Sequence, residues 1–445
     1  MKKNLVKYFI PIFLTMCLSY TFYRSEIVYK HQLFNFYIKY YVILILSIFF
    51  YILFIKKISN KFTYIVISLL ISLYLVESLL TVSEIYKEKK FKSKFLDKRN
   101  KLEVYADFKG SAVPTIPSFD IITKYPNNKL LALSGISNKK TIFCNESGYW
   151  AIYDSDRYGF NNPDKEWDAK EIDYLIVGDS FAHGACVNEK DSVGNNLRII
   201  SNKHLLNLGI EGNGPMLEYA TLREYLKIKK VNRVVWIYTG NDIFDLRTEK
   251  KNNILNEYFD NKNFTQDLKF KQYQIDKIYY DIVKTEIDNS KKKIIDEKYK
   301  KIFGFLKLSK IRERTLDYYS INKKTIKISE QEFEEYSKIL KLAKKFIEEN
   351  NSKFYFVYVA NNYVYHYDNF DENYIHQNLV KILKNLNIDY IDIHEELIRK
   401  HPDPKSLFPH RGPWHYNENG YKLIASHIYK RIAEMEKRWF FLMNC

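Results

Sequence analysis

The sequence predicts an α/β domain in which a parallel sheet lies between two layers of helices, with membrane-spanning helices before it. Short apolar runs rich in β-branched residues alternate with helical patterns, which is typical of a parallel, doubly wound sheet. The first three of these runs each end in a turn that contains glycine. A third observation separates residues 1–85, which contain three long apolar stretches, from the more polar remainder.

The apolar stretches at the amino terminus lie near residues 8–25, 38–56 and 62–82. A helix needs roughly twenty apolar residues to cross about 30 Å of hydrocarbon, and each stretch approaches that length. A signal peptide is the alternative for the first stretch, but no small-residue cleavage site follows it. We therefore expect residues 1–85 to be a transmembrane region whose partner is the lipid bilayer.

Basic residues flank these helices in two groups that predict opposite orientations. The first group places the amino terminus in the cytoplasm and, after three crossings, the large domain outside. The second group crowds the far end of the third helix, and the positive-inside rule would hold that end in the cytoplasm. The first group is Lys2, Lys3, Lys7, Lys56, Lys57 and Lys61, and the second is Lys87, Lys89, Lys90, Lys92, Lys94, Lys98, Arg99 and Lys101.

Composition narrows the classes of partner and cofactor. The chain of 445 residues carries a net charge of +17, which indicates a lysine-rich surface that can lie near anionic lipid. No basic motif with interleaved aromatic residues predicts a nucleic-acid partner. The four cysteines lack the spacing of a metal site, and we expect no metal and no other cofactor. A disulfide between Cys144 and Cys186 can form in an oxidising compartment.

The remainder of the chain divides into a connector and one large domain. Residues 86–150 are predicted to be a polar juxtamembrane connector interrupted by prolines, and residues 151–436 form the α/β domain. A helical insertion at about 248–328 interrupts that domain, either as a cap beside the site or as a solvated helical excursion. The predicted strands are 172–178, 205–208, 231–238, 354–359 and 390–393, and the predicted helices are 191–200, 215–229, 330–349, 373–386 and 420–436.

The stretch 173–184 carries the first candidate for chemistry. A buried strand ends at Gly178, and Asp179 and Ser180 follow it. Ligands of open α/β sheets bind just beyond the carboxyl ends of the strands, which is where Ser180 lies. The structural alternative is a plain strand-to-helix turn in which Ser180 is the helix N-cap.

Three further residues stand at comparable places in the predicted fold. Gly212 and Asn241 follow the second and third strands, and His415 precedes the last helix. Acyl transfer requires a hydroxyl nucleophile, a base that takes its proton, and donors that face the developing oxyanion. We expect Ser180 to be the nucleophile and His415 the base. The backbone N–H groups of Ser180 and Gly212, with the side-chain amide of Asn241, would form the oxyanion hole.

Together these residues resemble the four blocks of the SGNH hydrolases, also called GDSL-type esterases. The matching segments are Gly178-Asp-Ser-Phe181, Asn207-Leu-Gly-Ile-Glu-Gly212, Gly240-Asn-Asp242 and His415-Tyr-Asn-Glu-Asn-Gly-Tyr421. The resemblance covers about 150–435 without the insertion, and it implies an SGNH-like three-layer α/β/α sandwich. The order of apolar helices, connector and Gly-Asp-Ser-Phe is similar to membrane-tethered bacterial members. In those members the domain usually faces outside, which favours an extracytoplasmic domain here.

One position departs from the family pattern. The family usually has an aspartate three residues before the histidine, where it orients the ring, but this chain has Gly412. A main-chain carbonyl could hold His415 instead, giving a Ser–His dyad, and this is the preferred prediction. Asp403, or after it Asp392, could supply the carboxylate from another loop. An inactive chain is the remaining alternative.

The resemblance implies a membrane-anchored serine esterase that acts on O-acyl esters of envelope glycans or lipids through an acyl-enzyme. An O-acyltransferase would use the same residues, with a sugar hydroxyl in place of water. A non-catalytic carbohydrate-binding module is the third possibility, in which the same loops bind a glycan without attacking it.

Overall fold

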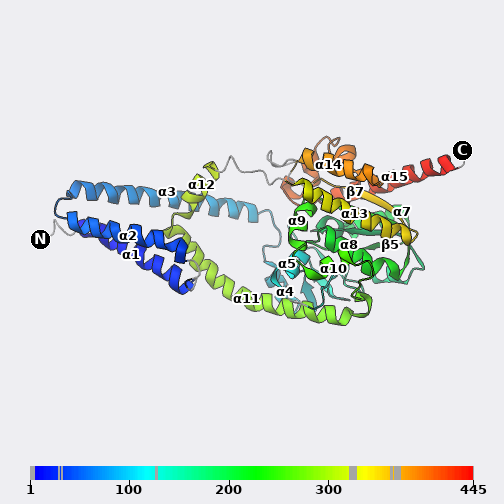
Figure 1. The fold of residues 1–445 in the computed structure, drawn as a ribbon, viewed down its shortest axis with the longest axis horizontal. Helices are drawn as coiled ribbons and strands as arrows, with labels where there is room; N and C mark the ends of the chain where they lie inside the picture. Colours follow the sequence, from blue (N-terminus) through cyan, green and yellow to red (C-terminus); the bar gives the residue numbers. More distant parts are fainter. Residues whose placement is uncertain are drawn as a thin grey trace. The chain divides into compact units, whose positions relative to one another are not determined.

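The computed structural model describes residues 6–28, 31, 34–125, 129–319, 328–360, 364 and 372–443. The chain divides into two compact units (Figure 1). Unit 1 comprises Met1–Glu88 and Asp296–Asn322, and unit 2 comprises Lys89–Ile295 and Lys323–Cys445.

Unit 1 contains the apolar helices of the amino terminus. They are α1 (Phe9–Phe22) with the π-helical turn Tyr23–Val28, α2 (Phe34–Phe54) and α3 (Asn60–Lys92), whose last residues belong to unit 2. Within the described residues, three helical stretches are long and apolar enough to cross a membrane: Val6–Val28, Phe34–Phe54 and Asn60–Phe91. Most of their large apolar side chains are exposed, which is the pattern of helices that face hydrocarbon.

Unit 2 is built on a sheet of five parallel strands. Its strands are β4 (Glu171–Gly178), β5 (Leu205–Asn207), β6 (Lys230–Tyr238), β7 (Lys353–Tyr358) and β8 (Asp389–Asp392), in the spatial order β5-β4-β6-β7-β8. All neighbouring pairs are parallel, so the carboxyl ends of the strands lie at one edge. The predicted parallel sheet is confirmed.

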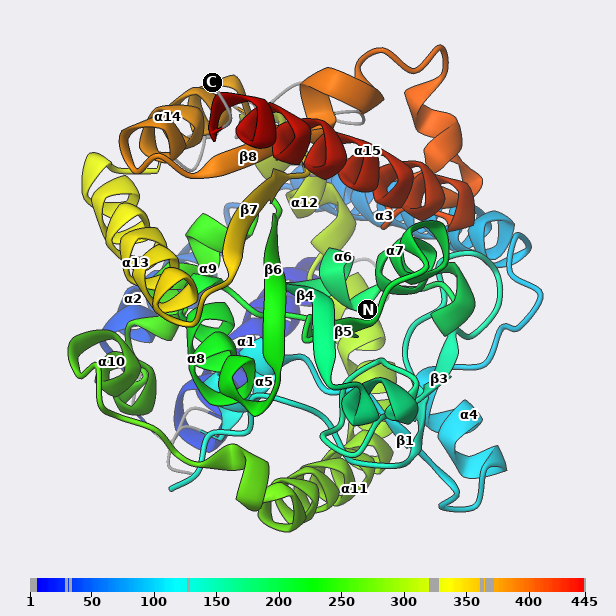
Figure 2. The ribbon, with the colours of Figure 1, turned by 90° about the vertical axis from the view of Figure 1, so that its right-hand side faces the viewer.

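Helices cover both faces of this sheet and bury the side chains that alternate along each strand (Figure 2). Leu175 and Val177 of β4 belong to one buried core, and Ile176 between them belongs to the other. The helices of the first core include α8 (Pro215–Tyr225), α13 (Glu330–Glu349) and α14 (Glu372–Asn385), and those of the second include α7 (Val193–Ser201) and α15 (Glu418–Met443). The predicted three-layer α/β/α sandwich is therefore confirmed.

Local sequence determines where these helices begin. At α13, the Ser329 hydroxyl accepts the N–H of Glu332, and the Glu332 carboxylate accepts the N–H of Ser329. This reciprocal capping box satisfies two backbone donors that the helix cannot satisfy itself. Tyr336, Leu340 and Ala343 then recur at helical spacing and are fully buried against the sheet.

Residues before the large sheet are themselves folded. Helices α4 (Lys101–Asp107) and α5 (Ser118–Lys124) accompany a small sheet with the strand order β1-β2-β3, made of Ala112–Pro114, Lys140–Ile142 and Ile152–Asp154. Ile142 and Phe143 are completely buried. Part of the stretch expected to be a connector therefore belongs to the folded body of unit 2.

The insertion after α9 (Asp242–Glu249) divides between the two units. Helix α10 (Asn253–Asp260) and the first half of α11 (Gln272–Leu306) bury Leu255, Tyr258, Ile275 and Tyr279 in the main core. That part is neither a cap nor a solvated excursion, because its apolar side chains complete the core. Residues from Asp296 onward, including α12 (Ser309–Tyr319), belong to unit 1, and residues 320–327 lie outside the described part of the chain.

Candidate active site

The candidate nucleophile lies in the tight turn between β4 and the short helix α6 (Ser180–His183). Gly178 has φ of +153°, and a Cβ there would lie 2.6 Å from the carbonyl oxygen of Ile237, so the turn requires glycine. The Asp179 carboxylate caps α6 by accepting the N–H of Phe181 at 2.9 Å. Because Asp179 occupies the N-cap, the alternative of Ser180 as the cap is wrong. Ser180 opens the helix, with its N–H unpaired within it.

The structure brings Ser180 and His415 together. His415 lies in the loop before α15, and its Nε2 is 2.9 Å from Ser180 Oγ. A second acceptor for the hydroxyl, Asp179 Oδ2, is further away at 3.3 Å. The ring of Phe181 packs against the imidazole with centroids 4.8 Å apart, which restricts its rotation. The geometry suits proton transfer from the serine to the histidine.

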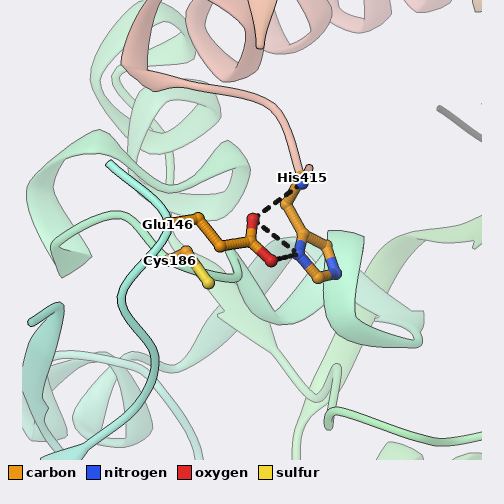
Figure 3. A group of neighbouring side chains, drawn as sticks. All are labelled: Glu146, Cys186 and His415. Atoms are coloured by element: carbon orange, nitrogen blue, oxygen red, sulfur yellow. Dashed lines mark hydrogen bonds and ion pairs between the residues drawn. The ribbon is translucent and has the colours of Figure 1, made fainter. Parts of the chain in front are cut away.

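A carboxylate that the sequence analysis missed holds the other side of the imidazole. His415 Nδ1 lies 3.0 and 3.1 Å from the two oxygens of Glu146, and the backbone N–H of His415 donates to Glu146 Oε2 at 2.8 Å (Figure 3). An acceptor at Nδ1 keeps the proton there and leaves Nε2 free to take one from Ser180. The arrangement is a Ser–His–Glu triad, and the preferred prediction of a dyad held by a main-chain carbonyl is wrong.

The same contacts set the acidity of His415. Burial, the largest influence, lowers its pKa, but the charge and hydrogen bond of Glu146, with the charges of Asp179 and Glu211, outweigh burial and hold the pKa above its usual value. Burial raises the pKa of Asp179, although the N–H of Phe181 opposes it. The imidazole is thus made more basic by carboxylates on both sides of the site.

The two aspartates expected near His415 lie elsewhere. Asp403 accepts two hydrogen bonds from the Arg411 guanidinium, at 2.6 and 2.8 Å, and Asp392 accepts one from His376 at 2.5 Å. The orienting carboxylate is therefore Glu146 and not Asp403 or Asp392. An aspartate could not simply replace Gly412, three residues before His415, because a Cβ at that position would lie 2.3 Å from an atom of the Trp414 ring.

The loop that follows β5 lies beside the nucleophile turn. The N–H of Ile210 donates to the carbonyl of Gly178 at 3.3 Å, which joins the two loops directly. Gly212 at the end of this loop has φ of +78°, a conformation that favours glycine. The loop is therefore joined to the nucleophile turn two residues before Gly212, and the role of Gly212 as a second oxyanion donor stays a prediction.

Asn241, which follows β6, is tied to the same turn through Asp179. Thr239 Oγ1 lies 2.8 Å from Asp179 Oδ2 and 2.7 Å from Asn241 Oδ1. The Asn241 amide donates to Asp179 Oδ2 at 3.3 Å and to Asp245 Oδ2 at 3.1 Å. These contacts hold the side chain beside the residue that precedes the nucleophile, and its role as an oxyanion donor stays a prediction.

A disulfide joins the loop of the acid to the loop of the nucleophile. Cys144 is bonded to Cys186, with the two Cα atoms 4.9 Å apart. Glu146 comes two residues after Cys144, and Cys186 comes six residues after Ser180. The cysteine pair was thus the signal that could have located Glu146, because bonding those two loops brings its carboxylate close to the nucleophile turn.

The described residues contain one group with the spacing of metal ligands, and it coincides with the triad. Ligand atoms of Glu146, Cys186 and His415 lie within 4.8 Å of one another (Figure 3). The Cys186 sulfur is bonded to Cys144, and Glu146 is hydrogen-bonded to the His415 ring. The donor set in this state therefore fits a proton-transfer site better than a cation site.

No protein-family model and no curated protein matches the sequence. Solved structures to which the chain is similar include a putative lipolytic protein of the G-D-S-L family from Desulfitobacterium hafniense DCB-2, at 13% identity and a TM-score of 0.33, covering 59% of this chain and 99% of that one. A GDSL-like lipase from Bacteroides thetaiotaomicron shares 11% identity at a TM-score of 0.33, covering 62% of this chain and 92% of that one. A two-domain esterase active on acetylated mannans shares 11% identity at a TM-score of 0.34, covering 62% and 52%. Likenesses at these TM-scores do not assign a function to the chain.

Proposed function

We propose that the chain is a serine ester hydrolase of SGNH type that cleaves O-acyl esters through a covalent acyl-enzyme. The observation that carries this proposal is the unbroken line of contacts from Glu146 through His415 to Ser180. Nucleophile, base and orienting acid come from three separate parts of the sequence. A module that only binds a glycan has no need for this alignment.

The reaction would proceed in two steps. Ser180 Oγ attacks the ester carbonyl carbon while His415 Nε2 takes its proton, and the imidazolium then protonates the departing alcohol as the ester C–O bond breaks. Water attacks the resulting acyl-serine, again giving its proton to His415, and the carboxylic acid leaves as the serine is restored. Glu146 keeps the imidazole in the required tautomer and stabilises its positive charge in both steps.

The donors for the transient oxyanion would be backbone N–H groups of Ser180 and Gly212 and the amide of Asn241. The loops that carry them leave the same edge of the sheet, and hydrogen bonds connect each loop to the nucleophile turn. Donors of this kind stabilise the negative charge because they are already oriented before the reaction begins.

The proposed substrates are O-acyl esters of envelope glycans or lipids, met at a membrane that the three apolar helices would anchor the enzyme to. We further propose that the α/β unit lies outside the cytoplasm. The Cys144–Cys186 disulfide supports this orientation, because such bonds persist mainly in oxidising compartments. The lysine-rich flank of the third helix predicts the opposite orientation, and the disulfide is evidence against that prediction.

A reporter that is active only outside the cytoplasm tests the orientation. Fused after Cys445, such a reporter is expected to be active, whereas a reporter that works only in the cytoplasm should be silent at that position. Activity of the cytoplasmic reporter alone would show that the basic flank governs the topology.

A fluorophosphonate probe tests whether Ser180 is an activated nucleophile. The probe is expected to label the purified full-length protein at one serine, identified by peptide mass spectrometry as Ser180. Ser180→Ala should be unlabelled, and Ser192→Ala, which removes a serine that caps α7, should be labelled normally. An unlabelled wild-type protein that is folded would reject the serine mechanism.

The disulfide should support turnover through Glu146. We expect the double variant Cys144→Ser, Cys186→Ser to lose most of its kcat with little change in KM, because the loop that carries the acid is no longer bonded to the nucleophile loop. The bond closes a 42-residue separation, so its loss should also cost about 2 to 4 kcal/mol of stability. Cys17→Ser is the control, since Cys17 is a free cysteine. A folded double variant with full kcat would contradict this role.

A further inference from the structure

The end of α11 and the start of α12 form a helical hairpin that belongs to the same compact unit as the apolar helices. Helix α11 begins in unit 2, where Ile275 is fully buried, and its last turns belong to unit 1. The chain then reverses at Leu308, which has φ of +53°, and enters α12. Residues 302–311 are called the hairpin segment below, and Figure 1 shows α12 against α3.

The hairpin segment contacts two of the apolar helices. The ring of Phe303 lies 6.0 Å from that of Tyr20 in α1, and the ring of Phe305 lies 5.7 Å from that of Tyr74 in α3. The hydroxyl of Tyr74 donates to the main-chain carbonyl of Leu306 at 2.8 Å. That hydrogen bond satisfies one of the carbonyls at the end of α11 that lack an intrahelical partner.

A buried glutamate of α3 holds the first turn of α12. Glu77 is 0% exposed, and its two carboxylate oxygens accept the backbone N–H groups of Lys310 and Ile311, each at 2.9 Å. The first N–H groups of a helix have no intrahelical partner, and the helix dipole favours negative charge at that end. An acidic side chain among apolar neighbours is costly unless it is paired in this way. The glutamate and the helix terminus therefore satisfy each other.

Three residues of the hairpin segment present exposed apolar side chains. Ile302 and Leu306, which lie one helical turn apart, are 52% and 54% exposed, and Phe303 is 38% exposed. Lys307 is the one charged residue among 302–308, and its Nζ lies 4.9 Å from the centre of the Tyr20 ring, where a cation can be stabilised by the aromatic face. Further along, Lys310 Nζ pairs with Glu84 at 2.7 Å. Glu84 is seven residues after Glu77, or about 10 Å along the helix. The exposed apolar side chains thus accompany the apolar part of α3.

We propose that the hairpin segment is a membrane-embedded element whose partner is the lipid hydrocarbon around α1 and α3. This inference rests on the proposed membrane anchoring by the three apolar helices. Its backbone polar groups at the turn are satisfied by Tyr74 and Glu77, which is the condition for placing non-helical chain at membrane depth. The insertion then returns the chain to the bilayer after the α/β domain has begun, so two segments, α3 and α11, connect that domain to the membrane.

Fluorescence quenching by lipids tests this placement in the full-length protein. The background would be Cys17→Ser, Cys445→Ser with the disulfide retained, and a nitrobenzoxadiazole maleimide would label Leu306→Cys before reconstitution into phosphatidylcholine vesicles with doxyl-labelled lipid. Leu46→Cys, in the middle of α2 and 47% exposed, is the reference for lipid contact. Tyr273→Cys, on the same helix α11 but in unit 2 and 83% exposed, is the reference for water.

Quenching at position 306 is expected to be at least half of that at position 46, with little quenching at 273. If position 306 behaves like 273 while position 46 is quenched, the hairpin segment is not in the bilayer but the anchoring stands. Absence of quenching at position 46 would reject the anchoring itself, and the inference with it.

Substitution of Glu77 tests what holds the hairpin segment in place. Glu77→Leu leaves the N–H groups of Lys310 and Ile311 without acceptors, so quenching at position 306 should fall toward that of 273. Glu77→Gln keeps one acceptor oxygen and should retain most of the quenching. Equal quenching in the two variants would show that Glu77 does not position the segment.

Discussion

Replacing Ser180 with alanine is expected to abolish ester turnover, with a loss of kcat on the order of 10⁶-fold, the scale found when a serine nucleophile is removed from a triad. The reason is that Ser180 Oγ forms the covalent bond in the proposed mechanism, and within the described residues no other hydroxyl is hydrogen-bonded to His415 Nε2. The measurement is kcat and KM for a chromogenic acetate ester with the purified protein. Only one oxygen atom is lost from a turn held by Gly178 and Asp179, so circular dichroism should be unchanged.

His415→Ala should be about as damaging as Ser180→Ala, because a serine without its base is a poor nucleophile. Groups that act as one unit are not additive, so the double variant should be no slower than either single variant. If the fold loss of kcat in the double variant equals the product of the fold losses in the two single variants, the residues act independently. Full turnover in Ser180→Ala would dispose of the mechanism altogether.

Glu146→Gln is expected to lower kcat by about 10³- to 10⁴-fold while leaving the fold intact. Comparable losses occur when the acid of a serine triad is replaced by its amide, because the amide can donate to the imidazole and favour the wrong tautomer. The side chain keeps its size and its position beside the disulfide, so KM should change little. A loss of kcat without a change in KM would show that the acid acts through His415 and not on the substrate.

The pH profile separates this positioning role from a structural one. His415 is an effective base only when neutral, so kcat/KM falls as the pH drops through its pKa. Glu146 raises that pKa, and removing its charge should move the acid limb of the profile to lower pH. A limb that stays in place or moves to higher pH would mean that Glu146 does not stabilise the imidazolium.

Asp403→Asn is the matched control for the acid. Its carboxylate is bound to Arg411 at the surface, and turnover should stay within about twofold of wild type. Loss of activity in Asp403→Asn together with full activity in Glu146→Gln would show that another conformation, with Asp403 at the histidine, is the active one.

The sheet and the nucleophile turn could be predicted because their causes are local. The runs of β4 and β6 are continuous and apolar, as strands buried on both faces must be. The turn that follows β4 needs a glycine where a Cβ would strike the neighbouring strand, and Gly178 stands there. Each of these features depends on a few consecutive residues.

The acid could not be predicted from its own surroundings in the sequence. Glu146 is 269 residues away from His415, in a loop between two short strands, and it is followed by no characteristic motif. Its position depends on the fold of residues 101–154 and on the bond from Cys144 to Cys186. A cysteine pair can be recognised in a sequence, but whether its bond forms depends on distances that only the folded chain sets.

The insertion at about 248–328 also combines a feature that short stretches of sequence predict with one that depends on distant contacts. Its helical pattern was visible, but what its side chains pack against depends on surfaces elsewhere. Tyr279 packs in the main core, and Phe303 and Phe305 contact the apolar helices. The sequence by itself determined the order of the strands along the chain, the turn that carries the candidate nucleophile, the candidate base and the three apolar helices. It could do so because hydrophobic periodicity and turn chemistry are encoded over short distances. Only the tertiary structure decided which carboxylate orients His415 and which surface takes up the insertion, because both depend on contacts between segments hundreds of residues apart.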